Sequence, residues 1–109
     1  MTTTVDDMPR VVLTVADVCF DRYHYDEVGD TLCFHTGPTE WAVEFDETVE
    51  DHLMRFNAHG VLLSLTVLNA RWRLDRDGAI DVTLREGGPT TRLPREVVEP
   101  LLVETPVYA

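Results

Sequence analysis

Residues 52–68, HLMRFNAHGVLLSLTVL, carry the clearest fold signal in the chain. Two apolar runs flank Asn57-Ala58-His59-Gly60, and asparagine and glycine are common in tight turns. This pattern predicts an antiparallel β-hairpin. Because the returning run, Val61 to Leu68, is almost continuously apolar, we expect it to be the most central strand of its sheet.

Alternation of apolar and polar residues with a period of two extends on both sides of this hairpin and predicts further antiparallel strands. Upstream, a hairpin is expected to turn at Gly29, a residue free to adopt positive φ. Downstream, Asp75-Arg76-Asp77-Gly78 predicts the turn of a third hairpin. The strands predicted outside residues 52–68 are 11–15, 18–25, 31–35, 41–45, 71–74 and 80–84.

The segment after Gly87-Gly88-Pro89 predicts one short helix. Pro94 and Glu96 suit a first helical turn, and apolar residues at 97, 98, 101 and 102 form one stripe, although Pro100 weakens the helix. The whole pattern predicts a mainly β (α+β) fold, an antiparallel meander-like sheet of about six to seven strands with a short C-terminal helix. Such a sheet needs a second layer, and we expect both the helix and a second copy of the chain to supply it.

The chain has the length of one domain, at 109 residues. We divide it into a loose N-terminal tail, residues 1–8, and a single β-rich domain, residues 9–109. No apolar stretch approaches the ~18 to 20 residues of a membrane span, and the acidic N-terminus lacks the basic and apolar regions of a signal peptide. The expected location is the cytoplasm. Cys19 and Cys33 lack CxxC spacing and are interpreted as small apolar residues.

The charge of the chain is strongly negative, with a net value of −11 from twenty acidic and nine basic residues. All the basic residues are arginine. Such a surface repels phosphate backbones and anionic membranes, so nucleic-acid and membrane partners are disfavoured. Solubility alone explains the charge, and the sharper alternative is a basic protein partner.

The aromatic residues and one acidic segment supply the candidates for a protein interface. The alternation around Trp41, Trp72, Phe34, Phe45 and Phe56 favours a place in the core, and the alternative is that one of these rings anchors a dimer interface. Arg71 and Arg73 flank Trp72 and are expected to form a basic spot that meets the acidic loop of a second copy. The acidic residues of that loop are Asp46, Glu47, Glu50 and Asp51.

Two weaker clusters suggest a ligand site. Asp21 and Tyr23 beside His35 have the groups for acid–base chemistry, since a carboxylate can orient a histidine that titrates near neutral pH. His52 and His59, together with the acidic loop, contain the ligand types that bind divalent metals. A polar cross-strand network and a solvated loop are the preferred interpretations of the two clusters.

Recognisable catalytic machinery is missing from the sequence. Ser64 is the single serine and lies in an apolar run without a GxSxG motif. Cys33 and His35 would lie roughly 7 Å apart on one strand face, too far for the hydrogen bond that activates a thiol. No phosphate-binding glycine motif is present. We therefore predict no catalytic residue, no metal and no cofactor, and regard enzymatic activity as open but disfavoured.

The stretch Tyr25 to Asn69 resembles a small bacterial family catalogued as domain of unknown function 2283. The similarity begins with YDEVGDTL at residues 25–32 and ends with RFNAHGVLLSLTVLNA at residues 55–70. The resemblance implies a compact β-rich domain that pairing of two copies helps to close, and it implies no activity. Some members look like neighbours of toxins, which would suit an acidic neutralising partner.

Two functional hypotheses follow. The first is a non-enzymatic protein-interaction domain, homodimeric through its sheet, with an acidic face toward a basic protein. The alternative is a domain that binds a small molecule or a divalent metal, with hydrolytic activity in the region of Asp21, Tyr23, His35 and Asp51.

Overall fold

A computed structural model describes residues 11–103, so the predicted tail at residues 1–8 lies outside the described part. Strands contain 42% of these residues and helices 16%, which confirms the predicted mainly β, antiparallel fold. The elements are β1 (Leu13–Val15), β2 (Val18–Phe20), β3 (Arg22–Asp26), β4 (Thr31–His35), β5 (Glu44–Glu47), β6 (Leu53–Phe56), β7 (Leu62–Leu68), α1 (Ala70–Asp77), β8 (Ala79–Val82), β9 (Thr91–Pro94), α2 (Arg95–Val98) and a 3₁₀ helix, η2 (Glu99–Leu101).

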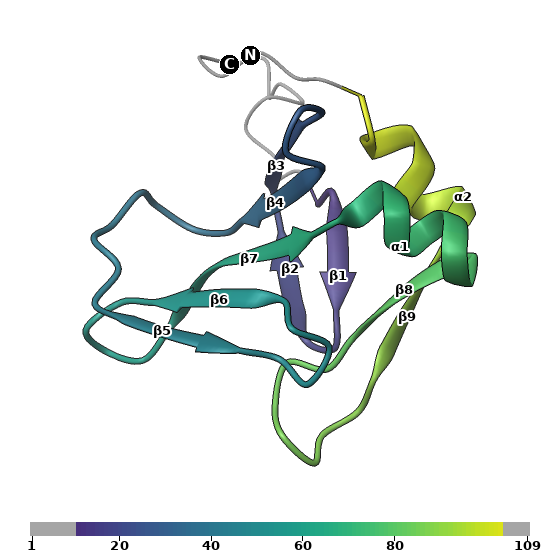
Figure 1. The fold of residues 1–109 in the computed structure, drawn as a ribbon. Coiled ribbons are helices and arrows are strands. Elements are labelled where there is room, and N and C mark those ends of the chain that lie inside the picture. Colours follow the sequence, from purple (N-terminus) through teal and green to yellow (C-terminus); the bar gives the residue numbers. More distant parts are fainter. Residues whose placement is uncertain (1–10, 104–109) are drawn as a thin grey trace, which may run out of the picture.

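The largest sheet has five strands in the order β3-β4-β7-β6-β5 (Figure 1). All of its pairs are antiparallel, and β7 lies in the middle, as the apolar run at residues 61–68 predicts. The predicted hairpin of residues 52–68 is confirmed as β6 and β7. Two smaller sheets, β1-β2 and β8-β9, complete the strands of the described residues.

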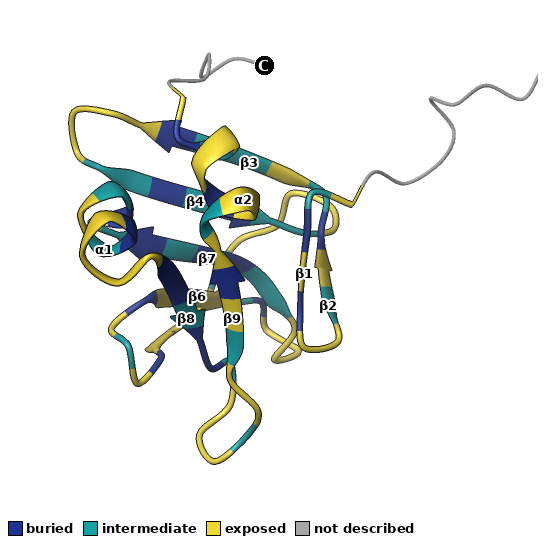
Figure 2. Ribbon diagram, turned by 90° about the vertical axis from the view of Figure 1, so that its right-hand side faces the viewer, coloured by how far each residue is buried: buried dark blue, intermediate teal, exposed yellow. Residues whose placement is uncertain are grey.

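The core lies on one face of the five-stranded sheet. Figure 2 shows α1, α2, β8-β9 and β1-β2 in front of that face. Leu32, Phe34, Leu65 and Val67 point into this core from β4 and β7 and are at most 1% exposed. The second layer therefore comes from within the chain, with the predicted C-terminal helix as one part of it. Val98 and Leu102 of the predicted stripe are buried, whereas Val97 is exposed.

The predicted third hairpin is wrong, because residues 70–77 form helix α1 instead of a strand. Ala70 and Leu74, one helical turn apart, are both buried. Gly78 has φ 75° and its N–H donates to the carbonyl of Leu74, so it ends the helix rather than turning a hairpin. Alanine, leucine and arginine are also favourable helix formers, which supports the helix locally.

Asp30 provides the cap that this helix lacks. Asn69, at the helix start, makes no capping hydrogen bond with its side chain. Instead the carboxylate of Asp30 accepts hydrogen bonds from the backbone N–H groups of Arg71 at 2.7 Å and Trp72 at 3.1 Å. It also accepts one from the hydroxyl of Tyr25 at 2.7 Å. The β3–β4 turn is thereby fixed to the helix.

The turn between β3 and β4 also differs from its prediction. Asp30, rather than Gly29, adopts positive φ, with a value of 51°. Aspartate tolerates this conformation better than most residues with a side chain. The carbonyl oxygen of Asp30 also accepts a hydrogen bond from the N–H of Ala70 at 3.0 Å. The residue with positive φ therefore bonds to the start of α1 through both its carboxylate and its carbonyl. None of the helices between residues 11 and 103 has the length and apolar character that crossing a membrane requires.

Candidate interaction surface

The second face of the five-stranded sheet is open within the described part of the chain. Strand pairing aligns its side chains in two rows that cross all five strands. The first row contains, in order, Arg22, His35, Ser64, Arg55 and Phe45. The second contains His24, Cys33, Thr66, Leu53 and Glu47. Directly paired side chains on one face lie about 5 Å apart at Cβ, so each row forms a continuous surface.

Two adjoining hollows of about 800 and 810 Å³ lie over these rows. They share His35, Phe45, Arg55 and Ser64, so they form one groove across the sheet. The segment between β4 and β5, which includes Trp41, forms one wall of it. The groove opens to solvent along its length and does not enclose a small molecule.

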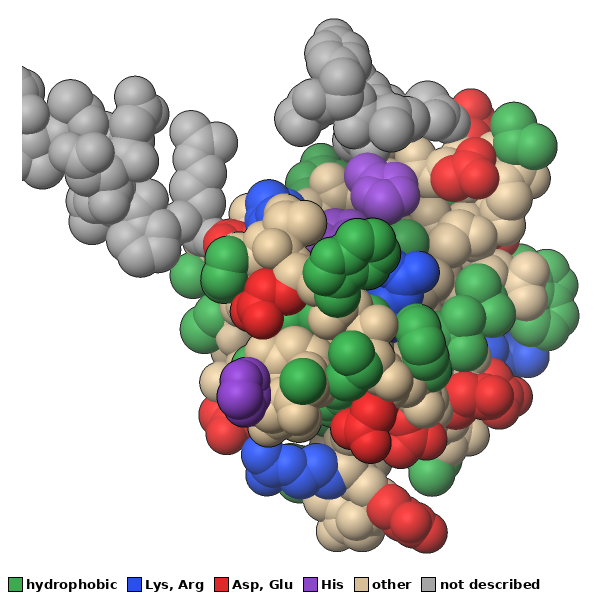
Figure 3. Space-filling view, turned by 90° about the vertical axis from the view of Figure 1, so that its left-hand side faces the viewer, with side chains coloured by type: hydrophobic (Ala, Val, Ile, Leu, Met, Phe, Trp, Pro, Cys, Tyr) green, Lys and Arg blue, Asp and Glu red, His purple; other side chains and the backbone are tan. Residues whose placement is uncertain are grey.

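Large apolar side chains are exposed around this groove. Trp41 is 90% exposed and Phe45 68% exposed, and both line the same hollow. Val43 and Leu53 are exposed beside them. Figure 3 shows hydrophobic side chains gathered in the centre of this side of the molecule. A contiguous apolar patch on a soluble surface is typical of a binding site.

The prediction that the aromatic residues lie in the core is therefore wrong for most of them. Of the five residues Trp41, Trp72, Phe34, Phe45 and Phe56, Phe34 is fully buried and Phe56 is partly buried. Trp41 precedes β5 instead of belonging to a strand at 41–45, and Phe45 lies on the open face of an edge strand. Trp72 is 56% exposed on α1, where the guanidinium of Arg76 lies 4.4 Å from its ring centroid.

Cationic and imidazole side chains occupy one half of the groove. The rings of His24 and His35 stack with their centroids 5.6 Å apart. Burial lowers the pKa of His35, and the electrostatic effects of the neighbouring His24, Arg22 and Arg55 lower it further. His35 is therefore neutral at pH 7. Arg22 donates to Asp21 at 3.0 Å and to the carbonyl of Gly37.

Arg55 is placed at the centre of the groove. Its guanidinium lies 5.9 Å from the ring centroid of Phe45, within the range of a cation–π contact. Among residues 11–103 it pairs with no carboxylate. This leaves a positive charge available on the face of an acidic protein.

Acidic side chains occupy the opposite rim, along β5. Glu44, Asp46 and Glu47 are all exposed on this strand, and the sheet order ends there. The carboxylate of Asp46 accepts a hydrogen bond from the N–H of Glu47 at 2.8 Å. Asp46 and Glu47 line the groove together with Phe45.

The other two acidic candidates, Glu50 and Asp51, lie in the β5–β6 turn rather than on β5. Glu50 turns toward β8-β9 and accepts from the N–H of Thr83 at 3.1 Å and from its hydroxyl at 2.7 Å. Burial raises the pKa of Glu50, but these hydrogen bonds outweigh it and the net pKa is lowered. Glu50 therefore fixes the β5–β6 turn to the rest of the fold. Asp51 is exposed in that turn with φ 74°.

Arg71 and Arg73 make contacts within the chain. Arg71 pairs with Glu99 at 3.4 Å, and Arg73 donates from Nε to the carbonyl of Leu68 at 2.8 Å. In the predicted strand, Arg71 and Arg73 would share the face opposite to Trp72. In helix α1 the side chains point in successive directions around the helix axis, so the two arginines no longer share one face. These contacts tie α1 to η2 and to the end of β7.

The structure brings together only part of the alternative ligand site: the N–H of Asp21 donates to the carbonyl of His35 at 3.1 Å, and the charge of Asp21 acts on the His35 imidazole. Asp21 pairs with Arg22, Tyr23 is partly buried against the core, and His35 lies on the open face. His59 is exposed in the β6–β7 turn. No three histidine, cysteine, aspartate or glutamate side chains within residues 11–103 gather as a metal site requires.

His52 has a structural environment that its sequence neighbours do not predict. It is 0% exposed, and its Nε2–H donates to the carbonyl of Asp81 at 2.8 Å. Its Nδ1 is buried and has no hydrogen-bond partner among residues 11–103. Burial lowers the pKa of this imidazole, so His52 is neutral in the folded chain near pH 7.

Comparison of the chain with protein-family models, with curated proteins and with solved structures gave no match. The resemblance of residues 25–69 to domain of unknown function 2283 therefore stays a prediction. Arg22, His24, Leu53 and Arg55 are the surface residues that sequence reasoning missed. Alternation along β3 and β6 could have shown that these residues lie on the outward side of each strand. The sequence does not show that the two strands contribute to the same face of one sheet.

Proposed function

We propose that this chain is a non-enzymatic protein-interaction domain whose partner covers the open face of the five-stranded sheet. The observation that carries the proposal is the exposure of Trp41 and Phe45 side by side on one groove. Tryptophan and tyrosine or phenylalanine rings supply much of the binding energy at protein interfaces, and each buries about 150–250 Å².

A basic partner segment fits the β5 side of this surface. Glu47 lies on the same face of β5 as Phe45, and Asp46 lines the same hollow at the edge of the sheet. A segment with an apolar side chain between the two aromatic rings and arginine or lysine on either side would satisfy both features. The net charge of −11 would also speed its approach at low ionic strength.

Self-association through the same face is the second candidate. Arg22 lies on β3 at one end of the groove, and the acidic rim is β5 at the other end, with Arg55 beside it on β6. A twofold axis parallel to the strands would place Arg22 of each copy opposite the acidic rim of the other. Pairing of β5 with β5 of a second copy is disfavoured, because it would oppose carboxylates.

The experiment compares the immobilised chain with Trp41→Ser and Trp72→Ser variants in extract from its native cells. Both variants remove one exposed tryptophan, but only the first alters the groove. We expect basic proteins that are retained by the wild type and by Trp72→Ser, depleted by Trp41→Ser, and lost at high salt. Equal retention by the two variants would contradict the proposed surface.

Sedimentation equilibrium of the purified chain tests the homodimer. A dimer formed through the groove should dissociate about thirtyfold more readily in Phe45→Ser, which corresponds to the loss of about 2 kcal/mol at a hot spot. Arg55→Glu should weaken it more at low salt than at high salt. A dimer that neither change affects would place self-association elsewhere on the chain.

A further inference from the structure

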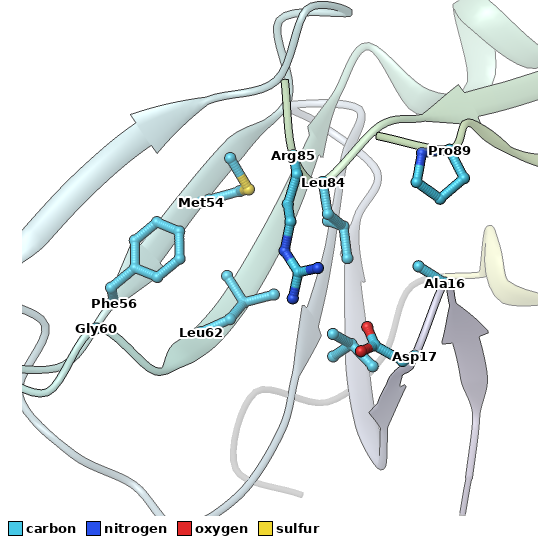
Figure 4. A pocket seen from close by; sticks show the side chains of 10 residues that line it. Ala16, Asp17, Met54, Phe56, Gly60, Leu62, Leu84, Arg85 and Pro89 are labelled. Carbon is cyan, nitrogen blue, oxygen red and sulfur yellow. The ribbon is translucent and has the colours of Figure 1, made fainter. Parts of the chain in front are cut away.

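A separate pocket of about 490 Å³ lies where the β1–β2 turn, the β6–β7 hairpin and the loop from β8 to β9 meet. Figure 4 shows its lining side chains, with Met54, Phe56 and Leu62 on one side and Ala16, Asp17 and Pro89 on the other. Its volume falls in the range of small-molecule sites, about 300–1,000 Å³. The pocket lies on the covered side of the sheet, whereas the interaction groove lies on its open side.

The walls of this pocket are apolar. Val18, Phe56, Leu62 and Leu84 pack against the core but keep part of their surface exposed, and Met54 behind them is buried. These partly buried side chains come from three segments that are far apart in the sequence: β2, the β6–β7 hairpin and the loop from β8 to β9. Filling the pocket with an apolar body would remove their remaining surface from water, which stabilises a complex by roughly 25 cal/mol per Å² before the costs of association.

One cation crosses the pocket. Figure 4 shows the side chain of Arg85 extending between Leu62 and Leu84, with its guanidinium toward the centre. Within residues 11–103 Arg85 makes no ion pair. Asp17 lines the same pocket, but its carboxylate does not pair with this guanidinium. Arg85 thus offers its hydrogen-bond donors to a group that the fold does not supply.

We propose that this pocket binds a small amphipathic molecule whose apolar body packs on Met54, Phe56 and Leu62 and whose carboxylate pairs with Arg85. A guanidinium donates two parallel hydrogen bonds to a carboxylate, and a partly desolvated pair of this kind is stronger than a neutral hydrogen bond. Asp17 repels the same carboxylate. The site therefore has one residue that strengthens binding of the anion and one that weakens it.

Decanoate is the probe, and the methyl group of Met54 is the reporter. The chain has three methionines, of which Met54 lines this pocket, whereas Met1 and Met8 lie outside the described residues. In full-length protein labelled with ¹³C at the methionine methyl groups, decanoate should shift the Met54 resonance saturably. Isothermal titration calorimetry should give one site per chain. Decanol and decylammonium, with the same apolar body, should bind at least about tenfold more weakly.

Two substitutions with opposite expected effects separate this binding from general adhesion to an apolar surface. Arg85→Gln should weaken decanoate binding about tenfold, and Arg85→Lys should restore part of the affinity as a point charge. Asp17→Asn should tighten binding about threefold by removing a nearby negative charge. Arg85 and Asp17 are both exposed, and an amide spectrum of each variant verifies that the fold is kept.

The proposal is overturned if saturating decanoate leaves the Met54 methyl resonance unmoved. It is also overturned if Arg85→Gln binds decanoate as tightly as the wild type, or if decylammonium binds equally well. Trp41→Ser leaves this pocket intact and should bind decanoate normally, so failure here does not bear on the interaction groove.

Discussion

The Asp30→Asn substitution should destabilise the fold far more than its small chemical change suggests. Asp30 lies in the β3–β4 turn, yet its carboxylate bonds to Tyr25, Arg71 and Trp72. Asparagine has nearly the same shape and tolerates the positive φ of 51° at this position. It has one acceptor oxygen, however, and its NH₂ group would face a backbone N–H as donor to donor.

The expected magnitude follows from these contacts. A hydrogen bond to a charged group contributes about 1.5–3 kcal/mol, and one of the three bonds is lost outright. The two remaining bonds become neutral and weaker, and the favourable interaction of a negative charge with the N-terminus of α1 disappears, about 0.5 kcal/mol. Because Asp30 is partly exposed, we expect a total loss near the low end, about 2 kcal/mol.

Urea unfolding followed by circular dichroism measures this loss, and a thermal scan should show a melting temperature lower by about 10 °C. Asp51→Asn is the matched control, because Asp51 also has positive φ, 74°, and is exposed in a turn. It should change the free energy of unfolding by less than about 0.5 kcal/mol. An equal effect of the two substitutions would refute the role of Asp30 as the cap of α1.

Three further predictions concern titratable groups. Burial and the hydrogen bond to Asp30 raise the pKa of Tyr25 to about 12. By ultraviolet absorbance, one of the three tyrosines should therefore titrate near pH 12, and Tyr25→Phe should abolish that step. The free energy of unfolding should fall as the pH rises from 10 through 12. Burial lowers the pKa of His52 below its ordinary 6.5, so the unfolded chain binds this proton more readily and the urea midpoint should fall as the pH drops from about 7 to 5. His52→Gln should flatten that slope and His59→Gln should not; the reverse would contradict the burial of His52. Glu50→Gln should lower the free energy of unfolding by about 1 kcal/mol at pH 7, because the hydrogen bonds to Thr83 become weaker. This difference between variant and wild type should shrink as the pH falls below 4.5, the ordinary pKa of glutamate. A constant difference across that pH range would exclude the charge of Glu50 as its source.

The sequence predicts those parts of the fold whose determinants are local. The hairpin at residues 52–68 follows from two apolar runs and a turn between them, and its central place follows from the apolar character of Val61 to Leu68. Helix α1 is different, because its start is capped by Asp30, whose carboxylate bonds to a residue 42 positions away. The local sequence, with Gly78 after two aspartates, fits a hairpin turn as well as a helix end.

Side-chain function is harder to predict than strand position. Alternation places Phe45 on one face of a strand, but it does not show whether that face is covered. Glu50 and His52 appear in an acidic loop, yet both turn inward because Thr83 and the carbonyl of Asp81 lie beside them in the fold. Asp46 and Glu47 keep the exposure that the charge pattern predicts, since an edge strand has no further strand to cover it.

The interaction surface can be tested most directly by photocrosslinking in the native cells. A benzophenone amino acid replaces Phe45 in one variant and Trp72, on the helix away from the groove, in another. We predict one specific adduct from position 45 and none of comparable yield from position 72, and the mass of the adduct distinguishes a second copy of the chain from a basic partner. Equal crosslinking from both positions, or an adduct from position 72 alone, would contradict a partner on the open face of the sheet.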